Sequence, residues 1–344
     1  MASPAAQMAL LDEITGHVAQ REQLKTLAAS NSTPHALMFV GPSGVGKRSC
    51  AIAFAAGLLT AAGKGSLSPQ EITALVRSGR HPDVQALRRD PEKKDLNVEA
   101  IRSLCSALQL KPYYGACSVA IIDNAEEMNV PASNALLMTL EEPPRNTYLL
   151  LVTDSPQTLP ETIVSRCQLI HFGELTEPET LAVIERCLGP LVQNTALLRQ
   201  LGAYAGTSLA ALGLGGFVAP NALALADEAA VRAHLDEFVS RTRTLEDQLN
   251  PFLAPAKNKQ RSLAHAVSLA TALSADKELL PLAWQALRVK LRTKLRTAKS
   301  AAEAEQWADA LLTAVEAEQL TRQRNLSPQL QLSNVLLRVA EISA

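Results

Sequence analysis

A phosphate-binding loop is predicted near the N-terminus of this chain. Gly41-Pro42-Ser43-Gly44-Val45-Gly46-Lys47 fits the pattern G-x-x-x-x-G-K, with an apolar run before it and an Ala-rich helical pattern after it. In this strand–loop–helix context, backbone N–H groups and the helix N-terminus face phosphate oxygens. Lys47 is then expected to reach the outer phosphates of a nucleotide. The alternative interpretation is a glycine turn with a chance lysine.

The residue after this lysine departs from the pattern. A Ser or Thr hydroxyl is needed there to hold Mg²⁺, and this chain has Arg48. Ser49 does not replace it, because the next residue of a helix points about 100° away. The pocket is therefore expected to bind nucleotide while its metal-assisted chemistry is impaired.

A second candidate site residue is the carboxylate of Asp123. The apolar run Ser118 to Ile122 ends at this residue, as in strands that deliver a Mg²⁺-binding carboxylate to the edge of a parallel sheet. A buried strand that merely ends in Asp is the alternative. Ring-forming ATPases place Glu at the next position, and Asn124 cannot accept a proton as that Glu does. Glu126 and Glu127 are interpreted as solvated helix residues.

Composition limits the classes of protein to consider. With 344 residues, 47% apolar and 3% aromatic, the chain predicts two or three domains with aliphatic, helix-rich cores. A net charge of −1 argues against a surface that wraps nucleic acid throughout. The five cysteines are scattered without metal-ligand spacing, and no signal pattern or long apolar run is present. A soluble, cytoplasmic protein is expected, with no membrane partner.

The elements that must position these residues alternate between strand and helix. Helices are predicted over 17–29 and 98–110, with a polar linker over 60–69. Apolar runs predict strands at 36–40, 83–87, 118–123, 148–153 and 168–172, and Thr153 is placed in the nucleotide-binding set. This alternation predicts a doubly wound parallel sheet with ligands at the carboxyl ends of its strands.

The second half of the chain is predicted to be helical. Short helices are expected over 178–187 and 196–205, followed by a glycine-rich hinge over 213–220. A helix near residue 290 combines a leucine stripe with a basic face, which is interpreted either as a solvated surface or as a contact for DNA phosphates. Its basic residues are Arg288, Lys290, Arg292, Lys294, Arg296 and Lys299.

These residues together resemble the clamp-loader branch of AAA+ proteins. Beside the phosphate loop and Asp123, the chain carries NALLMTLEEPP over 134–144, Ser165-Arg166-Cys167, and Asn325 to Leu330 near its end. The resemblance is nearer to the bacterial delta-prime family than to the gamma/tau motors, which keep Ser or Thr after the lysine and Glu after the aspartate. A lid arginine of the motors falls on Ala210 here.

The resemblance implies an architecture and a role. An AAA+ P-loop α/β domain over 1–172, a helical lid over 173–216 and a helical collar over 217–344 are expected. It further implies a hetero-oligomeric ring with gamma/tau and delta subunits that loads the sliding clamp onto primed DNA. In such a ring Arg166 would act on the nucleotide of a neighbouring subunit, while this chain holds ATP or ADP weakly or statically and has little turnover.

Other expectations follow from departures from the family pattern. The family often carries a four-cysteine zinc module, and the corresponding residues 60–81 contain no cysteine, so no zinc is expected. The main alternative function is an autonomous AAA+ motor acting on DNA, of gamma/tau or ring-helicase type. A small-molecule P-loop kinase is a further alternative, which leaves the SRC and EEPP segments unexplained.

Overall fold

The structure is a computed structural model. It describes residues 8–29, 33–62, 67–88, 96–114, 117–188, 228–253, 259–276, 279–324 and 326–343. These residues fall into two compact units. The α/β unit contains the described residues up to Leu188, and the helical unit begins at α12 (Glu228–Leu253).

A five-stranded parallel sheet forms the centre of the α/β unit, with the strand order β2-β3-β4-β1-β5. The strands are β1 (Ala36–Val40), β2 (Val84–Leu87), β3 (Ser118–Ile122), β4 (Thr147–Thr153) and β5 (Gln168–His171). All five residues of β1 and of β3 are buried, as expected for parallel strands that are covered on both faces. The predicted strand runs are thus present, with ends that differ by one residue at most.

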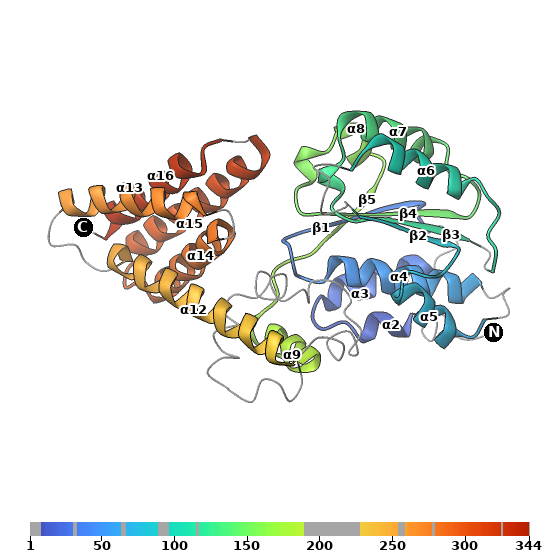
Figure 1. Cartoon of the computed structure of the whole chain (residues 1–344), viewed down its shortest axis with the longest axis horizontal. Helices are drawn as coiled ribbons and strands as arrows, with labels where there is room; N and C mark the ends of the chain where they lie inside the picture. Colours follow the sequence, from blue (N-terminus) through green and yellow to red (C-terminus); the bar gives the residue numbers. More distant parts are fainter. Residues whose placement is uncertain are drawn as a thin grey trace. The chain divides into compact units, whose positions relative to one another are not determined.

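Helices cover both faces of this sheet (Figure 1). One face carries α2 (Ala9–Asp12), α3 (Val18–Ala29), α4 (Lys47–Ala62) and α5 (Pro69–Arg77). The other carries α6 (Val98–Leu108), α7 (Val130–Glu141) and α8 (Glu161–Val164). Alternate residues of β1 divide between the two cores, because successive side chains of a strand point to opposite faces: Leu37 and Phe39 face α4, while Met38 and Val40 face the other helices.

Helix α4 is buried over most of its length, and small side chains make this burial feasible. The segment from Cys50 to Leu59 has no exposed residue, and Ala is its commonest residue type. Alanine costs no side-chain entropy in a helix and lets neighbouring elements approach closely. The helix therefore lies between the sheet and the outer helices α2, α3 and α5, where it fixes the position of the loop that precedes it.

Helix α5 was missed by the sequence analysis. The predicted linker over 60–69 includes the last turn of α4, and α5 begins at Pro69. Ser68 accepts a hydrogen bond from the Glu71 N–H, and the Glu71 carboxylate accepts the Ser68 N–H in return. This capping box, followed by Ile72 and Val76 on one face, was a readable signal for a helix start. The helix predicted over 98–110 is present as α6 and ends two residues earlier, at Leu108.

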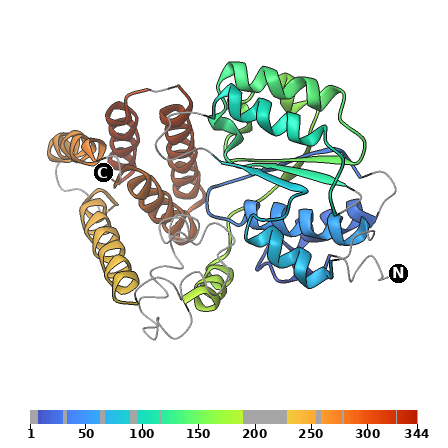
Figure 2. The same cartoon turned by 45° about the vertical axis from the view of Figure 1, so that its right-hand side comes forward.

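The helical unit confirms the all-α character of the C-terminal region (Figure 2). Its remaining helices are α13 (Lys259–Ala275), α14 (Leu279–Thr297), α15 (Ala301–Arg324) and α16 (Pro328–Ile342). Helix α13 packs on α16, and α15 packs on both α14 and α16. Trp284 and Trp307 are buried in this unit.

The fold class is confirmed: an α/β P-loop domain is followed by a region made of helices. The domain boundaries at 173 and 217 stay predictions. Of the expected lid, the structure describes α9 (Glu177–Leu188), and the predicted helix 196–205, the hinge 213–220 and Ala210 lie outside the described residues. None of the helices in the described ranges has the length and apolar character needed to cross a membrane.

Candidate functional site

The glycine-rich loop joins β1 to α4, and its three glycines, Gly41, Gly44 and Gly46, all have positive φ angles. Gly46 has a φ of +101°, which side chains other than hydrogen rarely allow. Gly41 lies against the end of β5, where an added Cβ would come within 2.3 Å of the Phe172 carbonyl oxygen. The Gly41 N–H donates to the Thr153 carbonyl at 3.3 Å. The loop is thereby held between the ends of β4 and β5, at the carboxyl edge of the sheet where the sequence placed it.

The Lys47 side chain is buried in this loop and is engaged within the chain. Its ammonium group donates to the carbonyl oxygens of Gly41 and Pro42 at 2.8 and 2.7 Å. It also donates to Asp154 Oδ1 at 2.6 Å. Sequence reasoning missed Asp154. Thr153, which it named instead, is fully buried, and its hydroxyl accepts a hydrogen bond from the Ser155 N–H.

Arg48 and Asp123 are brought together as an ion pair. Arg48 Nε lies 3.3 Å from Asp123 Oδ2, and Arg88 Nε lies 3.8 Å from the same oxygen. Burial raises the pKa of Asp123 above its usual range, and the nearby cations of Arg48, Arg88 and Lys47 oppose that rise. The carboxylate that was predicted to hold a metal therefore faces guanidinium groups from two directions.

The residues after Asp123 are arranged differently from the prediction. Asn124 adopts a left-handed conformation with φ 53° and donates to Glu127 Oε1 at 3.4 Å. The interpretation of Glu126 as a solvated residue was wrong. Its carboxylate is largely buried and accepts the Asp154 N–H at 3.3 Å, and burial raises its pKa. The tight turn at Asn124 directs Glu126 back toward the end of β4, which a helical reading of this segment could not anticipate.

The segment before α3 forms the rim of the loop. His17 Nε2 lies 2.8 Å from the Val45 carbonyl oxygen, and the imidazole packs edge-on against the Phe172 ring with centroids 4.9 Å apart. Burial lowers the pKa of His17, against smaller opposing effects from the Val45 carbonyl and from Glu179 of α9. A neutral imidazole therefore joins the loop to the end of the sheet.

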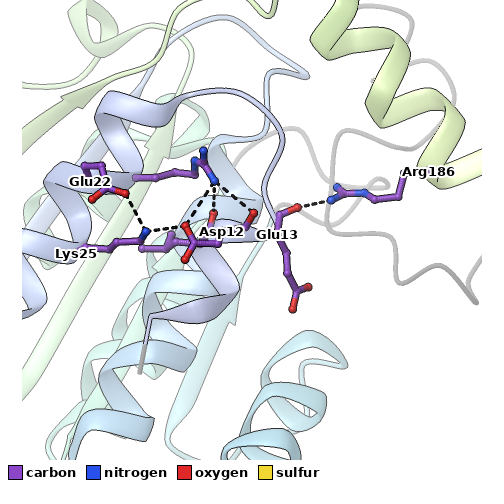
Figure 3. Close-up of polar contacts among 7 residues, drawn as sticks. Asp12, Glu13, Glu22, Lys25 and Arg186 are labelled. Carbon is purple, nitrogen blue, oxygen red and sulfur yellow. Dashed lines mark hydrogen bonds and ion pairs between the residues drawn. The ribbon is translucent and has the colours of Figure 1, made fainter. Parts of the chain in front are cut away.

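The same N-terminal segment contacts α9 directly. Arg186 donates to the backbone carbonyl of Glu13, as Figure 3 shows, and Leu175 Cδ2 lies 2.7 Å from the place where a Cβ on Gly16 would sit. On the other side of this segment, Lys25 donates to Asp12 Oδ1 at 2.6 Å and to Glu22 Oε1 at 2.8 Å (Figure 3). The first helix of the expected lid is thus attached to the α/β unit through residues 13–17.

The pocket is suited to bind a nucleotide phosphate but not Mg²⁺. The backbone of the loop and the N-terminus of α4 have the form that phosphate binding needs. Mg²⁺ does not fit, because no hydroxyl follows Lys47 and the Asp123 carboxylate is paired with Arg48. Among the described residues, no three His, Cys, Asp or Glu side chains are grouped so that they could hold a metal ion. The prediction that zinc is absent stays a prediction.

Arg166 lies outside this pocket, shortly before the amino end of β5. It follows α8, and its guanidinium contacts Glu141 Oε1 at 2.7 Å and the Thr162 carbonyl at 3.0 Å. The Glu141 partner lies in the EEPP segment, at the end of α7. Both side chains keep a large exposed surface.

The basic helix of the C-terminal half is α14, and part of its charge is used inside the helical unit. Arg288 pairs with the buried Glu318 at 2.8 Å, and Lys290 pairs with Glu246 at 3.3 Å. Lys294 lies 5.7 Å from the centre of the Trp307 ring, within the range of a cation–π contact. These residues therefore connect α14 to α12 and α15. Neither of the two interpretations, a solvated surface or a contact for DNA phosphates, had included such a role.

Comparison with known proteins finds similarity to subunits of DNA polymerase III. Residues 16–176 match a family model described as DNA polymerase III, delta subunit. The DNA polymerase III delta-prime subunit of Pseudomonas aeruginosa is 38% identical over 135 residues, which are 39% of this chain and 41% of that protein. The delta-prime subunit of Escherichia coli is 36% identical over 140 residues, 41% of each chain. The tau/gamma subunit of Haemophilus influenzae is 38% identical over 154 residues, 43% of this chain and 22% of that protein.

The match to the family model ends at residue 176, before the helical unit. The chain spans about two fifths of the length of the delta-prime relatives that it matches. The family model therefore covers the domain that carries the glycine-rich loop, Asp123 and Arg166.

Proposed function

We infer, from the match of residues 16–176 to the DNA polymerase III delta-subunit family, that this chain is a delta-prime-like subunit of a bacterial clamp loader. Its role in the ring is to support the loading of the sliding clamp onto primed DNA without turning over ATP itself. Its partners are gamma/tau and delta subunits, the sliding clamp and, through the assembled ring, primed DNA.

The observation that carries this proposal is the ion pair between Arg48 and Asp123. A guanidinium lies where a P-loop ATPase needs a hydroxyl and a metal ion, and Asn124 replaces the carboxylate that polarises water in motor subunits. A clamp-loader domain with this pocket is suited to a supporting subunit. The pocket residues in this proposal are Gly41 to Lys47, Arg48, Asp123 and Thr153.

Arg166 is proposed to act on the nucleotide of an adjacent subunit. A planar guanidinium can contact phosphate oxygens through two donors and stabilise charge that builds during transfer. The exposed pair with Glu141 supports this role, because its partner can be exchanged for another anion at little cost. Arginine fingers contribute roughly 10³–10⁵ in rate in well-studied GTPases, and the loss of one finger in a ring of several sites should cost far less of the total.

The test is the Arg166→Ala variant in a complete clamp loader with its native partners. We expect normal assembly, with reduced DNA-stimulated ATP hydrolysis and reduced clamp loading. Arg166→Lys keeps the charge but loses the planar fork, and it should recover only part of the activity. Arg145→Ala removes an exposed arginine from the loop before β4 and should change neither measurement. Failed assembly, or unchanged activity, would show that Arg166 has a structural role.

The helical unit is proposed to join a collar with partner subunits. It has its own apolar core and leaves Leu312 and Leu330 exposed, at 63% and 58% of their surfaces. Residues 217–344 should co-elute with the partner subunits, and residues 1–216 should not. The reverse result would overturn the assignment.

The alternative function is an autonomous AAA+ motor acting on DNA. Phosphate release by the isolated chain, with a gamma/tau subunit as positive control, separates the two functions. We expect no significant turnover. Robust turnover that is lost in Lys47→Ala would establish the motor.

A further inference from the structure

All hydrogen-bond donors of the Lys47 ammonium are used within the chain. An ammonium group has three N–H donors, and those of Lys47 are met by the carbonyls of Gly41 and Pro42 and by Asp154 Oδ1. The Lys47 side chain is only 5% exposed, so water does not supply a substitute for these partners. A phosphate that binds at Lys47 must therefore displace one of them.

Asp154 is the partner that a phosphate must displace. The two carbonyls belong to the loop that would surround the phosphate, whereas Asp154 lies directly after β4. Its carboxylate gives the ammonium a negatively charged oxygen that accepts a hydrogen bond, as a phosphate oxygen would. A phosphate that arrives while the carboxylate stays in place meets repulsion between like charges in a poorly hydrated pocket.

The position of Asp154 is fixed by the sheet. The pairing of Val40 with Thr153 places the end of β4 beside the loop, and the Asp154 N–H donates to the buried Glu126 carboxylate at 3.3 Å. Its carboxylate is held 2.6 Å from Lys47 Nζ with 23% of the side chain exposed. The neighbouring Arg48 and Asp123 pair neutralises the rest of the pocket in the same way.

We propose that Asp154 is an internal counter-ion that takes the place of a nucleotide phosphate at Lys47 and thereby sets the affinity of this pocket for nucleoside di- and triphosphates. The inference rests on the proposed function, in which this chain is a supporting subunit expected to hold nucleotide weakly or statically, but it makes no use of assembly or of Arg166. It assigns the weak binding to one residue, which is separate from the residues that impair turnover.

The test measures nucleotide binding by the isolated full chain with titration calorimetry, using ADP and ATP in the absence of Mg²⁺. Asp154→Asn keeps the size and the backbone of the residue and removes its charge. We expect it to tighten binding of both nucleotides at least tenfold. Adding Lys47→Ala to this variant should remove the gain, because the released ammonium is then missing.

Asp12→Asn is the matched control. Asp12 also accepts from a lysine at 2.6 Å, in the same unit, but its side chain is 57% exposed and lies on α2 (Figure 3). It removes the same charge and should leave nucleotide affinity unchanged. An equal gain in nucleotide affinity in Asp12→Asn would show that the effect comes from net charge. A gain in affinity that persists when Lys47→Ala is added to Asp154→Asn would show that the effect does not act through Lys47. Either result overturns the proposal.

A second variant keeps the proposal testable if Asp154→Asn does not fold. Asp154→Thr removes the charge with a smaller side chain, and thermal melting establishes that each variant is folded. Unchanged affinity in a folded Asp154 variant, or wild-type affinity as tight as that of the variants, would refute the role of Asp154. Turnover or failed assembly of the wild-type chain would refute the proposed function and leave this result standing.

Discussion

Two ion pairs, one at each end of the parallel strands, differ mainly in their exposure to water. Lys47 and Asp154 lie 2.6 Å apart with 5% and 23% of their side chains exposed. Arg166 and Glu141 lie 2.7 Å apart with 37% and 51% exposed. A charge that is removed from water needs a partner in the chain, whereas an exposed charge can exchange its partner for water or another anion.

The comparison separates a fixed pair from an exchangeable pair. In the pocket, internal neutralisation makes the loop stable without a ligand. The Arg166 guanidinium loses little free energy when it leaves Glu141, so it stays available to a neighbouring subunit. The following predictions test this contrast, from the largest expected effect to the smallest.

The rigidity of the pocket is tested by Gly41→Ala. The added Cβ would meet the Phe172 carbonyl at 2.3 Å, and a backbone atom cannot move aside as a side chain can. We expect a loss of about 3 kcal/mol in the free energy of unfolding, measured by urea denaturation. Gly46→Ala is the control, because no atom lies within 4 Å and only its φ of +101° opposes the change. Its loss should be about 1–2 kcal/mol. Equal losses would show that the contact with Phe172 is unimportant.

The contrast between the pairs is tested by removing one carboxylate from each. Asp154→Ala leaves the buried Lys47 ammonium without its charged partner, and we expect it to lower the free energy of unfolding by roughly 1.5–3 kcal/mol. Glu141→Ala should lower it by only about 0–1 kcal/mol, because Arg166 can turn to water. Urea denaturation of both variants decides the matter. Similar losses would mean that exposure does not distinguish the two pairs.

The pocket rim is tested by the pH dependence of stability. Burial lowers the pKa of His17 below 6.5, so the unfolded chain binds more protons than the folded chain between the lowered pKa and 6.5. Stability is therefore lost as the pH falls through this window. His17→Gln should make the curve flatter there, while His81, whose pKa burial also lowers, acts in both proteins. Parallel curves for the two proteins, measured from pH 7.5 to 5, would contradict this assignment.

The smallest effect is expected from salt at the exposed pair. A double-mutant cycle over Arg166 and Glu141 should give a coupling of about 0.2–1 kcal/mol at low ionic strength, which 1 M NaCl removes. The corresponding cycle over Lys47 and Asp154 should keep most of its coupling, because buried pairs are screened much less. A salt-resistant coupling at Arg166 would argue against an exchangeable guanidinium.

The strands and the loop could be predicted from the sequence because they depend on local pattern. Continuous apolar runs gave β1, β3 and β4 within a residue of their observed ends. Asp154 could not be found in this way, because its contact with Lys47 depends on β4 lying next to β1. The order of strands in a sheet cannot be predicted from the residues of a single segment. The sequence analysis stopped one residue short, at Thr153.

The partner of Arg166 was also beyond local reasoning. Glu141 ends α7 and Arg166 follows α8, and the two meet because these helices pack on the same face of the sheet. Charged neighbours in sequence, such as Glu161, gave no indication of this pairing. The helix α5 differs from both cases, because its capping box was present in the sequence and was overlooked.

The attachment of α9 to residues 13–17 has a mechanical consequence. Arg186 holds the Glu13 carbonyl, and Gly16 lies so close to Leu175 that even one added methyl group would collide with it. A rotation of α9 against the sheet must break the contact between Arg186 and the Glu13 carbonyl. Because His17 of the same segment contacts the Val45 carbonyl, we expect a displacement of α9 to be transmitted through residues 13–17 to the glycine-rich loop.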